Sequence, residues 1–479
     1  MTTITVDDAL DRAGTGAYQR RLMAIFGLVW AADAMQVLAV GFTAASIAAT
    51  FGLTVPQALQ TGTLFFLGML LGAVSFGKLA DRIGRRHVLI VTVSLDALFG
   101  LLSVFAPNFA FLLLLRFLTG AAVGGTLPVD YAMMAEFLPA RNRGRWLVML
   151  EGFWAVGTLV VALAAWAASR AGVADAWRYI FAVTAIPALI GVGLRFLVPE
   201  SPLYLLRRGK AHEAKTIVER ILLVNGKSKL GADVSLVSPP PVASEGIFSA
   251  DMRRRSLLIL AIWFLVSVSY YGVFTWMPPR LAGEGFGFVR GYGFLVFLAL
   301  AQIPGYALAA YGVEKWGRRP TLIGFCLLSS LGCLLFVAAE SGTLIGASLL
   351  TMSFALLGTW GALYAYTPEL YPTASRATGM GAAGGMARLG GLLAPSLMGL
   401  VVTQSFTLAV GIFSAFLLAA ALAAFLIDTE TRRRVARLSL EKPAVAPASI
   451  WIEASRDQDY LAPDCAPPCF CVPHLEIIP

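Results

Sequence analysis

The sequence predicts an all-α polytopic membrane protein with twelve transmembrane helices in two six-helix pseudo-repeats. Three observations lead to this fold class. The chain of 479 residues is 58% hydrophobic and only 14% charged, whereas charged residues make up about a quarter of an average soluble protein. Apolar runs of about 20 residues, long enough to cross a bilayer, recur along most of its length. Two charged motifs also recur at one common offset.

The apolar runs predict where each helix crosses the membrane. The first six spans lie near 22–48, 58–79, 88–106, 109–132, 146–168 and 177–198, and the second six near 256–277, 291–312, 320–339, 343–366, 378–403 and 406–427. The chain then divides into an N-terminal segment (1–21), a first bundle (22–198), a central loop (199–255), a second bundle (256–427) and a tail (428–479) expected to be poorly ordered. Within the central loop, RRGKAHEAKTIVERIL predicts a short amphipathic helix.

The positions of Lys and Arg predict the orientation of the chain. Of the 37 such residues, the loops on one side hold only Arg170, Arg178, Arg280 and Arg290, and nearly all the others lie on the opposite side. Because basic loops stay in the cytoplasm, we expect both termini and the central loop to be cytoplasmic, in a plasma (inner) membrane. The net charge of +9 then follows from topology and gives no indication of a nucleic-acid partner.

The charged motifs reveal an internal repeat. The stretch GKLADRIGRR (77–86) recurs as AYGVEKWGRR (310–319), and EFLPARNR (136–143) recurs as ELYPTASR (369–376) at the same offset. Two motifs with one offset indicate a duplicated six-helix unit, inserted the same way up in both copies. The matched acids and bases predict a cytoplasmic gate that latches the two halves and releases as they rock. The predicted gate residues are Asp81, Arg85, Arg86, Glu136, Arg143, Glu314, Arg318, Arg319, Glu369 and Arg376. The alternative is that the basic residues only set the topology.

At these motifs the chain resembles the major facilitator superfamily over about residues 20–435. RFLTGAAVG (116–124) is similar to its helix 4 signature, and PESP (199–202) and DTETRRR (428–434) resemble helix-end motifs of sugar porters and organic ion transporters. The resemblance implies the major facilitator fold and alternating access.

Three stretches narrow the resemblance within that superfamily. Residues 33–42, 128–158 and 366–395 are similar to the group that holds bacterial nicotinate transporters, synaptic-vesicle-protein relatives and organic ion carriers, with aromatic acid symporters close to it. This resemblance implies transport of a small organic acid. In one departure, Gln36 stands where those relatives usually have an acid, which weakens the case for proton coupling there.

Two charges near the middle of the bilayer are the main candidates for a site. At 1.5 Å per residue, Asp33 lies about 16 Å into the first predicted span and Arg388 about 15 Å into the eleventh. Such residues are costly and mark transport sites. A guanidinium holds a carboxylate with two hydrogen bonds, and the resemblance links a helix 11 arginine to anion binding. An internal ion pair or a packing role for Arg388 is the alternative.

Further candidates surround these two. Asp33 is expected to carry a proton, contact a cation or pair with Arg388, and Arg116 to serve proton coupling or packing. Aromatic side chains inside the spans predict stacking on a flat ring, although Trp and Tyr also collect at membrane interfaces. The predicted substrate-binding residues are Arg388, Asp33, Gln36, Trp30, Trp154 and Tyr364, and the predicted proton-coupling residues are Asp33 and Arg116.

These residues favour a secondary transporter for a small organic acid, aromatic or heteroaromatic and nicotinate-like. A sugar or organic cation porter is the first alternative, and a ligand-sensing membrane protein that does not transport is the second. We expect a monomer in the lipid bilayer whose partners are the substrate and protons. We expect no enzyme activity, because no nucleophile, base and orienting group cluster. We expect no cofactor and no metal, because Cys465, Cys469, Cys471 and His474 do not follow common zinc spacings.

Overall fold

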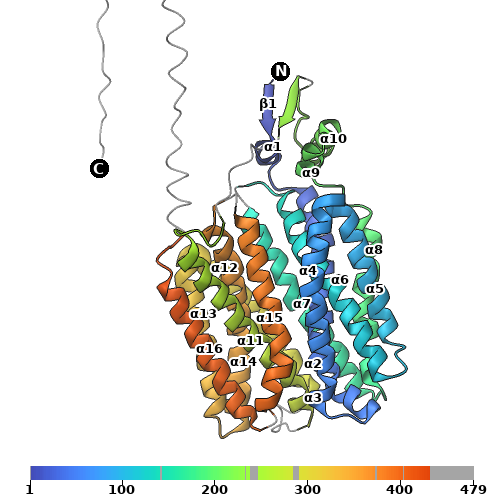
Figure 1. Cartoon of the computed structure of the whole chain (residues 1–479), viewed down its shortest axis with the longest axis vertical. Coiled ribbons are helices and arrows are strands. Elements are labelled where there is room, and N and C mark those ends of the chain that lie inside the picture. Colours follow the sequence, from blue (N-terminus) through green and yellow to red (C-terminus); the bar gives the residue numbers. More distant parts are fainter. Residues whose placement is uncertain are drawn as a thin grey trace, which may run out of the picture. The chain divides into compact units, whose positions relative to one another are not determined.

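The computed structural model describes residues 2–140, 143–231, 233–237, 246–283, 291–372, 375–402 and 404–431 (Figure 1). Within these ranges twelve helices of 19 residues or more form one bundle, and eleven of them are long and apolar enough to cross a membrane. The predicted all-α polytopic fold is therefore confirmed. The predicted tail, apart from residues 428–431, lies outside the described residues, and so do its cysteines and His474.

The long helices follow the predicted spans to within several residues. The first half contains α2 (Ala17–Phe51), α4 (Gln60–Ile83), α5 (Arg85–Ser103), α6 (Phe109–Ala135), α7 (Arg143–Arg170) and α8 (Ala176–Arg195). The second half contains α11 (Arg253–Gly283), α12 (Tyr292–Lys315), α13 (Arg318–Val337), α14 (Gly342–Tyr366), α15 (Arg376–Val402) and α16 (Phe406–Leu426). The shorter elements are β1 (Thr2–Thr5), α1 (Val6–Ala13), α3 (Val55–Ala58), α9 (Pro202–Arg207), α10 (Ala211–Val224), β2 (Val234–Val237) and the 3₁₀ helix η2 (Thr367–Leu370).

The two halves repeat the same helix packing. In the first half α4 and α5 pack on α6, α5 packs on α8, and α2 packs on α7 and α8. In the second half α12 and α13 pack on α14, α13 packs on α16, and α11 packs on α15 and α16. The halves meet where α2 contacts α11, α7 contacts α12 and α4 contacts α15. This one-to-one match agrees with the duplication indicated by the sequence motifs.

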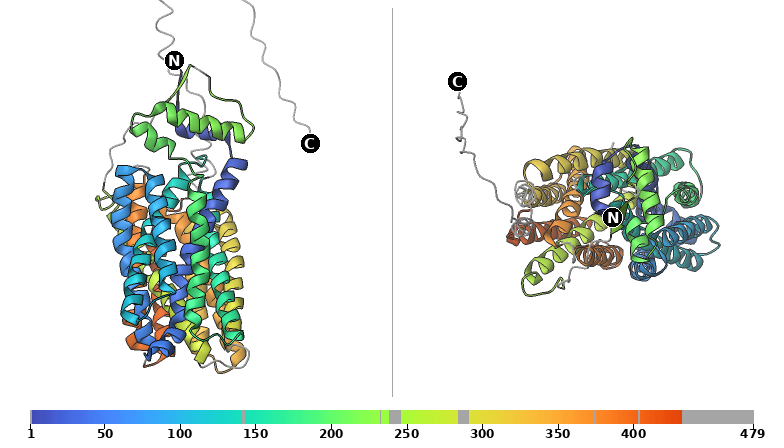
Figure 2. Two further views of the ribbon diagram at one scale, coloured as in Figure 1. Left: turned by 90° about the vertical axis from the view of Figure 1, so that its right-hand side faces the viewer. Right: turned by 90° about the horizontal axis from the view of Figure 1, so that it is seen from above.

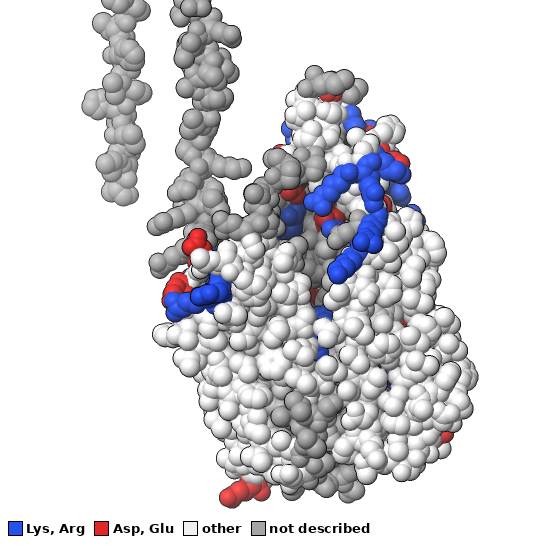
Figure 3. All heavy atoms as spheres, in the orientation of Figure 1, with Lys and Arg blue, Asp and Glu red and all other residues white. Residues whose placement is uncertain are grey.

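Helices α2 and α11 are the most buried of the eleven spans. Within the most apolar 18-residue stretch of each helix, 89% of residues are buried in α2 and 72% in α11, against 39% in α8. The middle of the molecule carries almost no charge on the face seen in Figure 3, and the charged side chains gather at its upper end. An uncharged band of this kind suits a surface in contact with lipid.

Two glycines of the RFLTGAAVG stretch explain the closest packing in the first half. A Cβ placed on Gly120 or Gly124 of α6 would overlap the backbone of α4 at Phe65 or Met69. Only glycine therefore permits this approach of the two helices, as in other membrane helix pairs. Arg116, one turn before Gly120, lies inside the same half.

The short elements β1, α1, α9, α10 and β2 lie over one end of the bundle (Figure 2). Strand β1 pairs in parallel with β2, and α1 packs on α10, which lies in the predicted amphipathic stretch and buries Ala214, Val218 and Ile221 on one face. Asn225 fastens the N-terminal segment, because its Nδ2 donates to the carbonyl oxygen of Gly14 at 3.2 Å and its Oδ1 accepts from the Tyr18 N–H at 3.1 Å. We call this end, which the charge distribution predicts to be cytoplasmic, the basic end.

Candidate functional site

The two halves enclose a cavity halfway along the bundle. Its volume is about 30 Å³, room for about two water molecules, so its side chains must move apart before a ring can enter. Both halves contribute to its wall, from α2, α4, α6, α7, α11, α12, α14 and α15. The lining residues are Trp30, Met69, Leu127, Glu151, Trp154, Tyr270, Tyr271, Tyr306, Leu357, Trp360, Tyr364, Ala387 and Arg388.

The structure brings together four of the six predicted substrate-binding residues. Arg388, Trp30, Trp154 and Tyr364 line the cavity. Asp33 and Gln36 do not line it, although they lie on α2 like Trp30.

Arg388 is half-buried and directed into the cavity from α15. Its Nη1 donates to the Gly384 carbonyl oxygen at 2.8 Å, and its buried Nε has no hydrogen-bond partner among the residues described. The expected pairing of Arg388 with Asp33 is not present, because no ion pair in the described ranges joins them. The guanidinium therefore has N–H groups that could donate hydrogen bonds to a substrate carboxylate.

Aromatic rings form most of the cavity wall and connect the two halves. The Trp154 indole N–H of α7 donates to the Tyr270 hydroxyl of α11 at 2.9 Å. Tyr131 of α6 lies 6.0 Å from Tyr364 of α14, measured between ring centroids, on the side of the cavity that faces the basic end. Tyr306 also lines the cavity but was not predicted from the sequence. A tyrosine in an apolar span is usually an interfacial or packing residue, so nothing marked it as part of a site.

The cavity is closer to open space at the basic end than at the other. Gly381 and Gly385 lie on the same face of α15 as Arg388, and a Cβ on either would meet no described atom within 4 Å. Toward the opposite end, a Cβ on Gly41 of α2 would come within 2.7 Å of the Phe274 carbonyl oxygen of α11. The halves are therefore in contact at that end and separated along α15 at the basic end.

Asp33 and Gln36 belong to a charged interior of the first half. Arg116 donates from Nη1 to the Gln36 side-chain oxygen and from Nη2 to the Gln36 carbonyl oxygen, both at 2.8 Å. Neither carboxylate oxygen of Asp33 has a hydrogen-bond partner in the described part of the chain. Asp96 of α5 lies close enough to both Asp33 and Arg116 for their charges to interact.

A buried ion pair completes this interior. Arg195 of α8 contacts both carboxylate oxygens of Asp130 of α6, and both side chains are almost completely buried. The Arg195 guanidinium also lies over the ring of Phe26, 4.5 Å from its centroid. The pair ties α6 to α8 and lies outside the cavity lining.

The predicted gate residues of the first half pair within that half or with the segments that flank it. Arg85, at the start of α5, forms an ion pair with Glu136, which also accepts from the Ser201 hydroxyl. The Arg86 backbone N–H donates to Glu200 at 3.2 Å. Arg143, at the start of α7, forms an ion pair with Asp7 of α1 at 2.7 Å.

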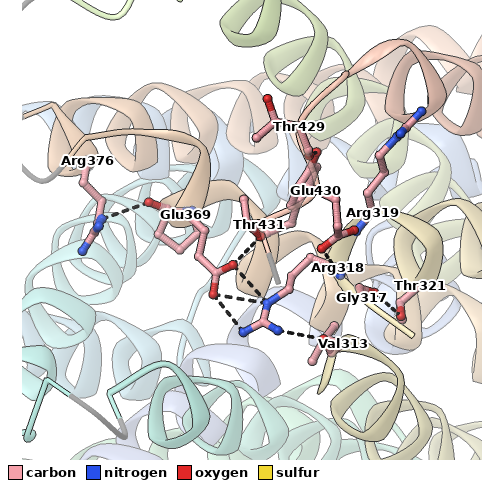
Figure 4. A network of polar contacts seen from close by, with 12 residues as sticks. Val313, Gly317, Arg318, Arg319, Thr321, Glu369, Arg376, Thr429, Glu430 and Thr431 are labelled. Atoms are coloured by element: carbon pink, nitrogen blue, oxygen red, sulfur yellow. Dashed lines mark hydrogen bonds and ion pairs between the residues drawn. The ribbon is translucent and has the colours of Figure 1, made fainter. Parts of the chain in front are cut away.

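The second half repeats this arrangement almost residue for residue (Figure 4). Arg318 forms an ion pair with Glu369 at 3.0 Å, and Glu369 also accepts from the Thr431 hydroxyl. The backbone N–H of Arg319 donates to Glu430 at 3.0 Å. Arg376 differs from Arg143, because its Nε donates to the Pro368 carbonyl oxygen at 2.9 Å instead of to an acid.

This pairing differs from the expected latch between halves. Among the described gate side chains, no ion pair joins the first bundle to the second. The reason is local, because Gly84 alone separates α4 from α5 and keeps the charged turn next to its own α6. Glu314 is exposed and forms no ion pair within the described ranges, and the Asp81 side chain lies outside them.

Two matched six-helix halves around a central cavity define a two-repeat membrane transporter. The family profile described as "Sugar (and other) transporter" matches residues 20–435. The niacin transporter NiaP of Acinetobacter baylyi is 35% identical over 424 residues, which cover 87% of this chain and 95% of that protein. The synaptic vesicle 2-related protein of Pongo abelii is 30% identical, with 90% of this chain and 82% of that protein covered.

Solved structures agree on the fold. The xylose transporter XylE from E. coli, in a partially occluded inward-open conformation, superposes with a TM-score of 0.71 at 20% identity, over 87% of this chain and 99% of that one. The chain belongs to the sugar (and other) transporter family. The resemblance inferred from its motifs is confirmed.

Proposed function

We propose that this protein is a secondary transporter that carries a small aromatic or heteroaromatic acid of the nicotinate type by alternating access. The observation that carries the proposal is Arg388, a cationic side chain with unused donors in a mostly aromatic cavity between the halves. A guanidinium suits a carboxylate, and the rings suit a flat substrate. The niacin transporters of Acinetobacter baylyi and Bacillus subtilis, at 35% and 34% identity, support the same substrate class.

The cavity favours this substrate over a sugar. Seven of the thirteen described lining residues carry an aromatic ring, and a flat aromatic acid can stack on such rings while Arg388 binds its carboxylate. The likeness to xylose transporters is at 20% identity and concerns the fold. A non-transporting sensor is distinguished by experiment, because only a transporter accumulates ligand against a gradient.

Proton coupling is the second part of the proposal. Asp33 is buried beside Asp96, which also interacts with Arg116, and the Asp33 oxygens have no partner among the residues that the structure describes. Such a carboxyl can exchange a proton when water reaches it. We infer that Asp33 and Arg116 form the proton-coupling site inside the first half, separate from the substrate cavity.

The gate is proposed to act through two within-half clusters. Arg85–Glu136 and Arg318–Glu369 hold the charged turns in place, so that each half presents a rigid surface when the basic end closes. The predominance of basic residues there supports a cytoplasmic basic end, and hence an inner-membrane protein with both termini inside. We propose a monomer that is not an enzyme.

The test is uptake of radiolabelled nicotinate into proteoliposomes, with and without an inward proton gradient. Arg388→Ala is expected to abolish uptake, whereas Arg170→Ala, the same change at an exposed helix end, is expected to leave it intact. Asp33→Asn is expected to keep nicotinate exchange but lose the response to the gradient. Folded wild-type protein without nicotinate uptake would refute the substrate class, and uptake indifferent to the gradient would refute coupling through Asp33.

A further inference from the structure

Glu151 is a buried acid in the substrate cavity to which the proposed function gives no role. It lies on α7, lines the cavity, and is only 2% exposed. Its Oε1 has no hydrogen-bond partner within the part of the chain that the structure describes. Burying a carboxyl oxygen without a partner is costly, so its presence calls for a ligand or a proton that the cavity receives.

Arg388 and Glu151 form no direct ion pair, although their charges lie close enough to interact. The two side chains come from opposite halves and line the same cavity, and no ion pair within 4.0 Å joins them in the described residues. Arg388 also keeps its Nε without a partner there. The cavity therefore presents one acidic and one basic group that are both available, one on each half.

The rings around Glu151 suit a positively polarised partner. Trp30 and Trp154 come from the same half as Glu151, and Tyr270 and Trp360 from the other. Aromatic faces attract cations, and the attraction grows when water is excluded. The other buried acids of the first half, Asp33, Asp96 and Asp130, do not line the cavity, which leaves Glu151 as the acid that a substrate there would meet.

We propose that Glu151 binds a basic or cationic nitrogen of the substrate while Arg388 holds its carboxylate. The preferred substrates are then flat acids with a ring nitrogen, such as pyridine carboxylates, over simple aryl acids such as benzoate. A protonated Glu151 donates to a neutral ring nitrogen, and an ionised Glu151 accepts from a protonated one. In both cases one proton is shared between the carboxyl and the nitrogen. This inference rests on the proposed function and specifies its substrate.

The test is equilibrium binding of nicotinate and benzoate to the purified full-length protein. Glu151→Leu is expected to weaken nicotinate binding by roughly 10-fold to 100-fold, the effect of removing a hydrogen bond to a charged group, and to change benzoate binding by less than about twofold. Retained benzoate binding also shows that the variant is folded. Glu340→Leu, the same change at an exposed loop residue, is the matched control and is expected to alter neither.

A conservative variant keeps the proposal falsifiable if Glu151→Leu fails to fold. Glu151→Gln keeps a donor but no charge, so permanently cationic N-methylnicotinate should lose more affinity than nicotinate. Equal loss of nicotinate and benzoate binding in a folded variant would overturn the role of Glu151 and leave the transporter proposal standing. Unchanged binding with loss of gradient-driven uptake of both acids would make Glu151 a proton carrier and also overturn it. Folded wild-type protein that binds neither acid would refute both proposals.

Discussion

The interiors of the two halves differ in charge, although the halves repeat the same helix packing. Helices α5 and α13 begin at the matched residues Arg85 and Arg318, and α6 and α14 begin at the same offset. Counted from these starts, the first half buries three charges where the second half buries neutral side chains. The equivalent positions are Asp96 and Ser329, Arg116 and Leu349, and Asp130 and Leu363.

The comparison teaches that the buried charges are not needed for packing. At the same helix contacts the second half has hydrogen bonds between hydroxyl groups. Ser330 bonds to Ser414 at 2.7 Å, and Ser329 bonds to Thr359 at 3.2 Å. Neutral hydrogen bonds avoid the cost of burying ions. Charges retained in only one of two duplicated units therefore favour a function, and the second half contributes Arg388 to the cavity instead.

The largest expected effect, on stability, comes from replacing Asp130 of the first half with leucine, the residue at the equivalent position of the second half. Asp130→Leu leaves the Arg195 guanidinium buried without its acid, which we expect to cost about 3–5 kcal/mol of folding free energy. The measurement is thermal unfolding of the purified protein in detergent. The double variant Asp130→Leu, Arg195→Leu should recover most of this loss. A single variant as stable as the wild type would contradict a structural role for the pair.

The next effect concerns ion coupling. Asp96→Ser installs the equivalent residue of the second half, and we expect gradient-driven accumulation to disappear while exchange at equal pH continues. A gradient of about one pH unit supplies about 1.4 kcal/mol per proton, or about tenfold accumulation, so the loss is measurable. The mirror change, Ser329→Ala, should leave the gradient response unchanged. Full accumulation in Asp96→Ser would show that Asp33 acts without Asp96.

A smaller effect separates the two halves at the basic end. Arg143 forms an ion pair with Asp7 of the N-terminal segment, whereas the equivalent Arg376 donates to a backbone carbonyl oxygen. The pair is partly exposed, so Asp7→Ala should cost at most about 1 kcal/mol and raise hydrogen exchange in β1 and α1 several-fold. Asp11→Ala, at an exposed position of the same helix, is the control. Unchanged exchange in Asp7→Ala would mean that strand pairing alone holds the segment.

Much of this arrangement could be predicted from the sequence, because span length and repeat spacing follow directly from residue order. The depth of a residue in the bilayer also follows from residue order, which is why Arg388 could be predicted as a substrate-binding residue. The face of the helix does not follow, because each residue turns the side chain by about 100°. Asp33 comes three residues after Trp30 on α2, an offset of about 60° around the helix, and of the two only Trp30 lines the cavity.

The gate shows the same limit for pairing. The repeat identified Glu136 and Glu369 as partners of arginines, but sequence order cannot tell whether an acid meets a base of its own half or of the other. The short turn at Gly84 decides this, because it holds Arg85 beside the end of α6. Glu151 lacked a distinguishing signal, since an acid near a helix end is as consistent with a loop-side ion pair as with a cavity wall.

The smallest expected effect tests whether every acid in the repeated motifs serves the gate. Glu314 is exposed and has no ion-pair partner among the described residues, whereas Glu369 binds both Arg318 and Thr431. Glu314→Gln should therefore change the free energy of unfolding by no more than about 0.5 kcal/mol and leave nicotinate uptake unaltered. Glu369→Gln should slow uptake, because it releases the Arg318 turn. If Glu314→Gln slowed uptake as much as Glu369→Gln, Glu314 would have to find a basic partner in a second conformation, with the basic end closed.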